Sequence, residues 1–238
     1  MLESLRNKRI MVVVAHPDDE VLGPGGTMYR LINEFNCTIH VVILGEGITS
    51  RSHSRDIQKW EAELKRHHIN ILEAKEKIGY QTVATFDFPD NRFDSVSLLD
   101  IIKVIENEKK LFSPDVIFTH HGGDLNIDHQ RTFEAVITCN RPLSFEKVST
   151  IITFETMSGT EWRASSDPRH FIPNMIVEIG EDGLNAKIEA METYMFEKRN
   201  YPHPRSSEAI KIRSQMWGIA NGMNFGEAFQ IIRTIAKL

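Results

Sequence analysis

Short apolar runs alternate with longer segments of helical period through the first 155 residues of the chain. The apolar runs are nearly continuous, which is typical of strands that are buried on both faces of a parallel sheet. They predict strands at 9–15, 38–44, 82–86, 115–119 and 150–155. The segments between them predict helices at about 24–35, 55–78, 95–111 and 128–138. This order indicates an α/β fold: a Rossmann-like, doubly wound, mostly parallel sheet with helices on both faces.

The last third of the chain has a different pattern. Residues 156–174 are rich in Gly, Ser, Pro and Asp, which indicates a loop. After it we expect a strand at 175–179, helices at about 182–197 and 205–220, and a tail at 227–236 that fits a strand or a short helix. No linker separates this region from the rest. We therefore expect 1–238 to form a single domain, in which a C-terminal extension at 156–238 completes a core at 1–155.

The composition narrows the class of protein. The 238 residues include 28 Lys and Arg against 33 Asp and Glu, which gives a net charge of −5. This excess of acid argues against a nucleic-acid partner or a broad surface for anionic membranes. Two cysteines, Cys37 and Cys139, are too few for a disulfide framework and fit a reducing compartment, most simply the cytoplasm. No apolar run is long enough for a signal peptide or a transmembrane segment.

Metal-capable side chains follow the first and the fourth predicted strands. His16, Asp18 and Asp19 come directly after the first strand, and a polar segment from His120 to His129 follows the fourth. In open α/β sheets, ligands bind at the carboxyl ends of the strands, where the strand order reverses. In the Rossmann order this switch point lies between the first and the fourth strands. We therefore expect the two clusters to lie on neighbouring loops.

Two imidazoles and one carboxylate, with one position left for water, are typical of a catalytic zinc site. His16, Asp19 and His129 are the candidate ligands for Zn²⁺ or another divalent transition metal. Zinc lowers the pKa of a bound water to about 7, and a carboxylate that is not a ligand can then act as general base. Asp18 is our candidate for that base. Asp128, next to His129, is a candidate to orient an imidazole.

Each residue of this set, taken alone, also has a purely structural interpretation. Asp18 or Asp19 fits the N-cap of the helix that follows, and a lone histidine at a strand end is more often structural than a metal ligand. The glycine-rich segment 23–26 is also a weak signal for a nucleotide-phosphate site. It does not match GxGxxG, however, and the acids before it would repel a phosphate. We interpret the glycines as allowing a tight turn beneath the metal loop.

The segments AHPDDEVLGPGG and THHGGDLNIDH together resemble the PIG-L/LmbE-type N-deacetylase family. The first matches the HPDDE signature of the family in full, and the second matches its closing Asp-His. The resemblance implies a zinc-dependent hydrolase on a Rossmann-like fold. It implies a small substrate whose N-acetylglucosamine unit loses its acetyl group. It also implies that His16, Asp19 and His129 hold zinc and that Asp18 is the base.

One position departs from the family pattern. The family often has a histidine three residues before the last ligand, whereas this chain has Asn126. An asparagine can donate a hydrogen bond to an oxyanion but cannot shuttle a proton. Either Asp18 returns the proton to the leaving amine, or another histidine does. His120, His121 and His203 are the candidates.

Polar loops follow the second and third predicted strands at the same edge of the sheet. Arg51, Asp90 and Arg92 in these loops are candidate substrate contacts, and a loop-stabilising salt bridge is the alternative for each. His120 and His203 are further candidates for contact with the substrate. The segment that begins at His203 would close the pocket from the C-terminal part.

The predicted helix at 55–78 alternates positive and negative charges, as exposed helices do. This pattern places His67 and His68 on the surface of that helix. The segment 205–208 has an alternative role as a helix start, with Ser206 or Ser207 as the cap.

The sequence leaves other functions open. The same three ligands suit a non-haem iron(II) oxygenase with a two-His-one-carboxylate site. A non-catalytic sugar- or nucleotide-binding module is a further alternative, although binding alone does not need a spare base. The sequence does not say whether the N-acetylated sugar is lipid- or nucleotide-linked, or whether the chain forms a homo-oligomer.

Overall fold

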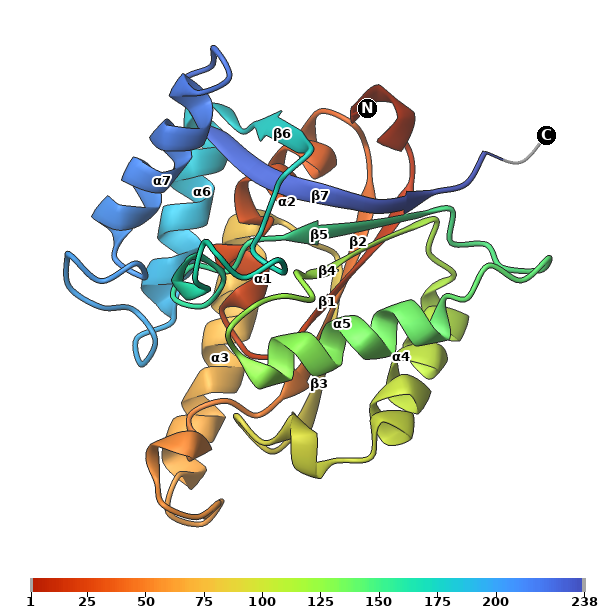
Figure 1. Cartoon of the computed structure of the whole chain (residues 1–238). Helices are drawn as coiled ribbons and strands as arrows, with labels where there is room; N and C mark the ends of the chain where they lie inside the picture. Colours follow the sequence, from red (N-terminus) through yellow and green to blue (C-terminus); the bar gives the residue numbers. More distant parts are fainter. Residues whose placement is uncertain (1, 237–238) are drawn as a thin grey trace.

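The computed structural model describes residues 2–236, which fold around one seven-stranded sheet (Figure 1). The strands are β1 (Arg9–Val14), β2 (Thr38–Gly45), β3 (Thr82–Phe88), β4 (Val116–His120), β5 (Thr150–Phe154), β6 (Met175–Glu178) and β7 (Gly226–Thr234). Their order across the sheet is β3-β2-β1-β4-β5-β7-β6. The first five strands pair with one another in parallel, and β7 lies antiparallel between β5 and β6. The predicted Rossmann-like, doubly wound, mostly parallel sheet is confirmed.

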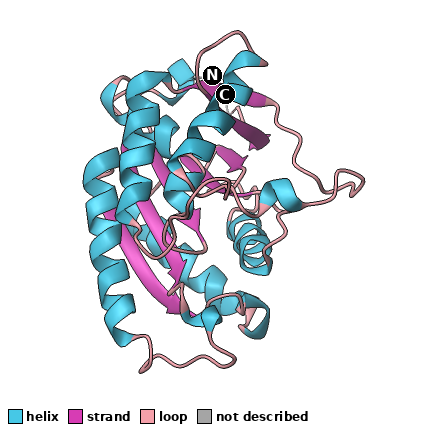
Figure 2. Ribbon diagram, turned by 90° about the vertical axis from the view of Figure 1, so that its left-hand side faces the viewer, coloured by secondary structure: helices cyan, strands magenta, loops and turns pink. Residues whose placement is uncertain are grey.

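Helices cover both faces of this sheet (Figure 2). They are α1 (Asp19–Leu22), α2 (Gly25–Asn33), α3 (Glu61–Ile78), α4 (Leu98–Phe112), α5 (Ile127–Cys139), α6 (Gly180–Thr193) and α7 (Ser207–Ile219). Short 3-10 helices occur at Leu2–Leu5, Thr49–Arg51, Phe93–Ser95 and Thr160–Trp162. α4 and α5 pack against one face, and the other helices pack against the opposite face.

The residues of β1 show why its sequence is continuously apolar. Ile10, Val12 and Val14 enter the core shared with α2, α3 and α6, while Met11 and Val13 enter the core shared with α4 and α5. All five side chains are fully buried. A strand covered by helices on both faces has no side that needs polar residues.

Some elements differ from the sequence-based prediction. β3 is half-exposed because it lies at the edge of the sheet, although its apolar run suggested burial on both faces. α3 begins at Glu61 rather than near residue 55, since the Asp56 carboxylate accepts a hydrogen bond from the main-chain N–H of Lys59 and holds a turn there. α2 lies within the range 24–35 where a helix was expected, and a single helical turn that was not expected, α1, precedes it. The tail, which fitted a strand or a short helix, is the strand β7.

The C-terminal part shares the sheet and one core with the N-terminal part. β6 and β7 extend the sheet beyond β5, and α6 packs against α2 and α3. Figure 1 shows α6 and α7, in cyan and blue, next to each other, and β7, in blue, running across the sheet beside β5. The interpretation of 1–238 as one domain stays a prediction. No helix within the described residues combines the length and the apolar character that a bilayer span requires, and the cytoplasmic location also stays a prediction.

Candidate metal centre and substrate pocket

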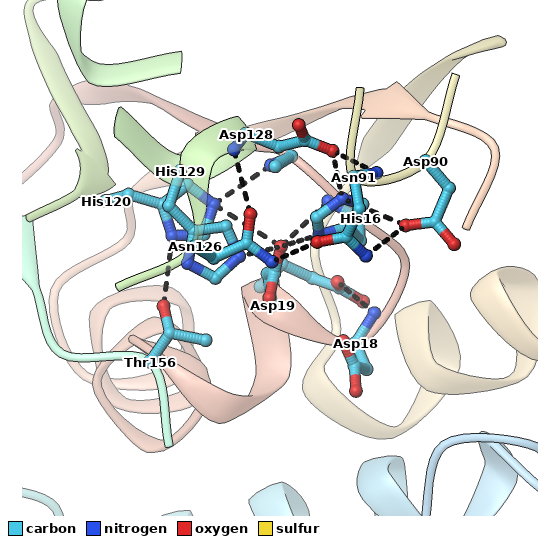
Figure 3. A network of polar contacts seen from close by, with 12 residues as sticks. His16, Asp18, Asp19, Asp90, Asn91, His120, Asn126, Asp128, His129 and Thr156 are labelled. Atoms are coloured by element: carbon cyan, nitrogen blue, oxygen red, sulfur yellow. Dashed lines mark hydrogen bonds and ion pairs between the residues drawn. The ribbon is translucent and has the colours of Figure 1, made fainter. Parts of the chain in front are cut away.

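Two segments that are far apart in the sequence meet at the carboxyl ends of β1 and β4. These strands are neighbours in the sheet, so the turn after β1 faces the loop after β4, as the switch-point argument predicts. The first segment carries His16, Asp18 and Asp19, and the second carries Asp128 and His129 in the first turn of α5. Figure 3 shows side chains from both segments converging on one place.

The turn after β1 is held by its own hydrogen bonds. The main-chain N–H of His16 donates to Asp19 Oδ2 at 2.7 Å, and the buried carboxylate of Glu20 accepts from the main-chain N–H of Asp18 at 3.1 Å. Asp18 has a left-handed φ of 103°, which residues other than glycine rarely adopt. It occupies the N-cap position of α1, but its carboxylate makes no capping hydrogen bond. The side chain is therefore free for another role, and backbone strain of this kind is typical of functional sites.

His16, Asp19 and His129 form what we call the ligand cluster. Each offers one ligand atom, and these three atoms lie within 4.8 Å of one another. Asp19 Oδ2 lies 3.4 Å from His16 Nδ1 and 3.4 Å from His129 Nε2. Asp19 Oδ1 is buried and has no hydrogen-bond partner within the described residues. Because a buried carboxylate oxygen is costly to leave unpaired, this donor set fits a divalent cation such as zinc.

Each histidine of the ligand cluster has a buried carboxylate behind it. Asp128 Oδ2 lies 2.8 Å from His16 Nε2, and the same carboxylate accepts the main-chain N–H groups of Asn91 and Phe93. Asp124 Oδ1 lies 3.2 Å from His129 Nδ1. Carboxylates in this place fix the orientation of ligand imidazoles. Asp128 therefore has the geometry of the predicted orienting residue.

Asp124 is a second such carboxylate, which the sequence analysis missed. It lies in the polar segment that follows β4, but nothing in its spacing distinguished it from Asp128. In the structure Asp124 is fully buried, and its carboxylate also accepts the main-chain N–H of Asn126 at 2.8 Å and the hydroxyl of Thr160.

Buried charges shift the pKa values within the site. Burial disfavours a charge on His129, but the carboxylates of Asp19 and Asp124 outweigh it and raise the pKa of His129 to about 9. Burial likewise disfavours a charge on Asp19, but nearby His129 and His120 hold the pKa of Asp19 well below its ordinary value. To bind a metal, His129 must lose its proton, whereas Asp19 is already ionised.

Asp18 differs from Asp19 in this respect. Its pKa is raised well above the ordinary value, chiefly because burial removes the carboxylate from water, and the guanidinium of Arg205 opposes this effect. Like charges on Asp19 and Glu197 add to the rise. The pKa of Asp18 is thus raised, whereas that of its neighbour Asp19 is lowered. Asp18 is therefore the carboxyl that can hold a proton.

His120 lies behind the ligand cluster rather than in the pocket. Its ring stacks on His129 with centroids 3.8 Å apart, and it is fully buried. Its Nε2 accepts the main-chain N–H of Ala15 at 2.9 Å, and its Nδ1 lies 3.0 Å from Thr156 Oγ1. Burial and the neighbouring His129 lower the pKa of His120 to about 4, so the ring is neutral. A direct substrate contact or a proton-donor role, both predicted for His120, does not fit this burial.

A polar pocket opens beside the ligand cluster. It is lined by His16, Pro17, Asp18, Gly47, Ile48, Ser50, Arg51, His67, Asp90, Asn91, Asn126, Glu197 and Arg205. Of the predicted substrate contacts, Arg51 and Asp90 line this pocket, whereas Arg92, His120 and His203 do not. His121, a candidate proton donor, does not line it either. The guanidinium of Arg92 instead donates to the carbonyl of His53 at 3.2 Å.

The two other predicted histidines are likewise engaged elsewhere. His121 Nε2 lies 2.7 Å from the carbonyl oxygen of Arg169. His203 Nδ1 accepts the main-chain N–H of Arg205 at 3.1 Å, so His203 supports a pocket residue without lining the pocket itself. Arg205 of the same segment lines the pocket, and Ser206 caps α7, as the alternative interpretation predicts.

Four of the residues that line the pocket form what we call the charged wall: Arg51, His67, Glu197 and Arg205. Glu197 joins the two arginines, since its Oε1 accepts from Arg51 at 2.7 Å and its Oε2 from Arg205 at 2.7 Å. His67 and Glu197 come from outside the segments that the sequence indicated for the pocket. Arg51 was predicted as a substrate contact, and Arg205 belongs to the segment after His203 that was predicted to close the pocket.

His67 corrects the sequence-based interpretation of α3. It was placed on the helix surface, but its side chain is buried against Tyr194 and Phe196 and lines the pocket. Neither ring nitrogen has a hydrogen-bond partner of regular geometry within the described residues, although Nε2 lies 3.6 Å from Glu197 Oε1. His68, by contrast, is exposed as predicted. The segment that buries His67 lies about half the chain away, so no local pattern could reveal it.

Asn126 lies at the edge of the pocket as the N-cap of α5. Its Oδ1 accepts the main-chain N–H of Asp128 at 2.8 Å, and its Nδ2 donates to Asn91 Oδ1 at 3.0 Å. The second hydrogen on Nδ2 remains for another acceptor. Asn126 therefore has both a structural role and a spare donor.

The glycine-rich segment does not form a phosphate site. The main-chain N–H groups of Gly26 and Thr27, at the start of α2, donate to the carboxylate of Glu227 on β7 at 2.9 and 2.8 Å. Lys187 Nζ pairs with the same carboxylate at 2.7 Å. A Cβ on Gly26 would lie 2.9 Å from Ile179 Cδ1, so this glycine is needed for close packing rather than for the tight turn that we expected. The chain's own carboxylate occupies the place where a phosphate binds in other doubly wound proteins.

The family model for PIG-L, described as GlcNAc-PI de-N-acetylase, matches residues 11–140, which is more than half of the chain. This range contains the ligand cluster and both carboxylates behind it. The chain belongs to the PIG-L family.

Relatives agree with this PIG-L assignment. An uncharacterized deacetylase of Escherichia coli (strain K12), YaiS, is 26% identical over 200 residues, which cover 81% of this chain and 95% of YaiS. The N,N'-diacetylchitobiose deacetylase of Pyrococcus horikoshii has a TM-score of 0.73 at 19% identity, covering 95% of this chain and 84% of that one. The zinc-inhibited form of teicoplanin deacetylase Orf2 has a TM-score of 0.74 at 12% identity, covering 96% of this chain and 100% of Orf2.

The same fold also occurs in an enzyme of a different class. GalB of Pseudomonas putida KT2440, a 4-carboxy-2-hydroxymuconate hydratase, has a TM-score of 0.70 at 20% identity, covering 97% of this chain and 99% of GalB. Structural likeness at these identities shows the fold alone. The reaction of this PIG-L protein has to be argued from its site.

Proposed function

We propose that this protein is a zinc-dependent N-deacetylase that removes the acetyl group from an N-acetylated amino sugar or its conjugate. The products are acetate and a free amine. The observation that carries the proposal is the ligand cluster with Asp18 beside it in a polar pocket. Membership of the PIG-L family supports the reaction class, and the deacetylases among the structural relatives support an acetylated sugar as substrate.

His16, Asp19 and His129 would hold the zinc, which supplies Lewis-acid activation of a water and of the amide carbonyl when bound. Asp128 and Asp124 keep the two imidazoles in orientation. Asp90 and Arg51 line the pocket and offer an acceptor and a donor for sugar hydroxyls. Most of the residues that line the pocket are polar, which suits a hydroxyl-rich substrate.

Asp18 takes a proton from the attacking water, whose oxygen bonds to the amide carbon. The second Nδ2 hydrogen of Asn126 is a donor for the oxyanion that develops, an interaction worth about 2.7–4 kcal/mol in other acyl-transfer sites. The C–N bond then breaks, and the leaving amine needs a proton. Asp18 is our candidate for this second transfer, because its raised pKa lets it hold the proton that it has taken. None of the other candidate histidines lines the pocket.

The two alternatives are weaker on this structure. An iron(II) oxygenase needs no general base, whereas Asp18 stands beside the ligand cluster with a raised pKa. A nucleotide-binding module has little support, because Glu227 fills the site at the start of α2.

The experiment is a screen of N-acetylated amino sugars and their conjugates for release of free amine, with and without a chelator. We expect amine and acetate in equal amounts, loss of release with chelator and recovery with Zn²⁺. Oxygen consumption with Fe²⁺, in the absence of acetate release, would instead favour the oxygenase. A panel without any amine release would contradict the proposal.

A further inference from the structure

Arg205 comes from the C-terminal part of the chain but reaches the candidate base. It lies in the turn before α7, and its Nη1 is 3.0 Å from Asp18 Oδ2. That oxygen is buried and has no hydrogen bond of regular geometry within the described residues. The charge of Arg205 is therefore what faces this side of the carboxylate.

The guanidinium of Arg205 is itself held by several groups. Its Nη1 also donates to Glu197 Oε2 at 2.7 Å, and its Nε donates to Ser158 Oγ at 2.8 Å. The main-chain N–H of Arg205 donates to His203 Nδ1 at 3.1 Å. A planar guanidinium that is bound at both Nε and Nη1 has little freedom to rotate. The position of its charge is consequently fixed by residues outside the motif that contains the base.

The Asp18 carboxylate needs such an anchor. Its neighbour Asp19 is surrounded by imidazoles, whereas Asp18 lacks the capping hydrogen bond that its N-cap position would allow. A general base works only within hydrogen-bond reach of the proton that it abstracts. A misplacement of about 1 Å costs on the order of 100-fold in rate.

We propose that Arg205 is a positioning residue for Asp18, and that Glu197 and Ser158 hold Arg205 in place. The catalytic meaning of this inference rests on the proposed deacetylase function. The alternative is a purely structural role, in which the ion pair only ties the segment before α7 to the turn after β1.

Kinetics of matched variants separate these roles. We expect Arg205→Gln to lower kcat by about 100-fold with little change in KM, because the base acts in the transition state. Arg205→Lys should recover part of the loss, because lysine restores the positive charge but not the planar guanidinium that bonds two partners at once. Ser158→Ala should cause a smaller loss, by removing the anchor of Nε. Arg199→Gln is the control, because Arg199 is exposed on the same segment and donates only to main-chain carbonyls. A kcat for Arg205→Gln within about twofold of wild type would overturn the proposal.

A second measurement does not depend on activity. In a double-mutant cycle, the denaturation midpoints of Asp18→Asn, Arg205→Gln and the double variant are compared with wild type, all in chelator. We expect Arg205→Gln to shift the midpoint less when Asp18 is already Asn. Additive shifts would show that the pair does not interact and would overturn the inference. If the wild-type protein releases no amine from any substrate, the proposed function fails, and the cycle still decides whether Arg205 holds Asp18. Coupling in the cycle together with unchanged kcat would identify the structural role and also overturn the proposal.

Discussion

The ligand cluster and the charged wall face the same pocket, but the fold builds them differently. The ligand cluster stands at the ends of two central strands, and each of its imidazoles has a buried carboxylate behind it. The charged wall draws on the loop after β2, on α3 and on the segment between α6 and α7, and its two arginine side chains are 22–34% exposed. The first region is dense and mostly buried, whereas the arginines of the second form ion pairs at the edge of solvent.

This difference suggests a division of labour. Buried, hydrogen-bonded groups hold fixed positions, which a metal site requires. Partly exposed ion pairs contribute little to stability, because solvent screens them. We therefore expect changes in the ligand cluster and its neighbours to affect metal binding and turnover. Within the charged wall, changes at Arg51 and His67 should affect affinity for the substrate, whereas Arg205, which contacts Asp18, should affect turnover.

The largest effect is expected at the boundary between the two regions. Asp18→Asn should keep the metal, because Asp18 is not in the ligand cluster, but should lower kcat by about 10²–10⁴-fold through loss of the base. Metal content and initial rates of amine release check this prediction. Asp100→Asn, a change to an exposed residue of α4, is the control. Near wild-type turnover in Asp18→Asn would remove it from the mechanism.

The next effect tests the carboxylate behind His129. Asp124→Asn keeps the shape of the side chain but weakens its hold on the imidazole, so we expect metal affinity to fall by about 10- to 100-fold. Competition with a chromophoric chelator measures this change. Unaltered affinity would show that Asp124 only supports the loop through Thr160 and Asn126.

A smaller effect is expected in the charged wall. His67→Asn should raise KM a few-fold and leave kcat nearly unchanged, since it alters contacts made equally in the ground and transition states. His68→Asn, on the exposed side of the same helix, should leave both constants unchanged. Equal behaviour of the two variants would contradict the placement of His67 in the pocket.

The smallest effect distinguishes two arginines that the sequence treats alike. Arg51 lines the pocket, whereas Arg92 binds the carbonyl of His53. Arg51→Ala should therefore raise KM, and Arg92→Ala should change the kinetics by less than about twofold, as is usual for residues outside a site. A larger effect from Arg92→Ala would place the substrate beyond the pocket described above.

The ligand cluster could be predicted from the sequence because two rules act together. Nearly continuous apolar runs identify central strands, and the switch-point rule then places the residues after β1 and β4 side by side. These two rules are enough to predict that His16 and His129 lie close together. The edge position of β3 escaped prediction because its residues, which include Val83 and Phe86, differ little from those of a buried strand.

The charged wall could not be predicted in the same way. His67 sits among Lys, Arg and Glu on a helix whose charge pattern indicates exposure, and only the packing of Tyr194 and Phe196 buries it. Glu197 and Arg205 belong to a segment whose position depends on the tertiary packing of α6 and α7. Contacts of this kind follow from long-range geometry, which periodicity and spacing do not encode.

The central position of β1 and β4 has a consequence for the lifetime of a bound ion. Local openings of a native protein start at frayed termini and loops, while the middle of a sheet opens only with global unfolding. Since β1 and β4 have neighbours on both sides, hydrogen exchange of their amides should be among the slowest in the molecule. Pulling the two strands apart would then not be a practical route for an ion, which leaves local opening of the turns or the mouth of the pocket as its way in and out.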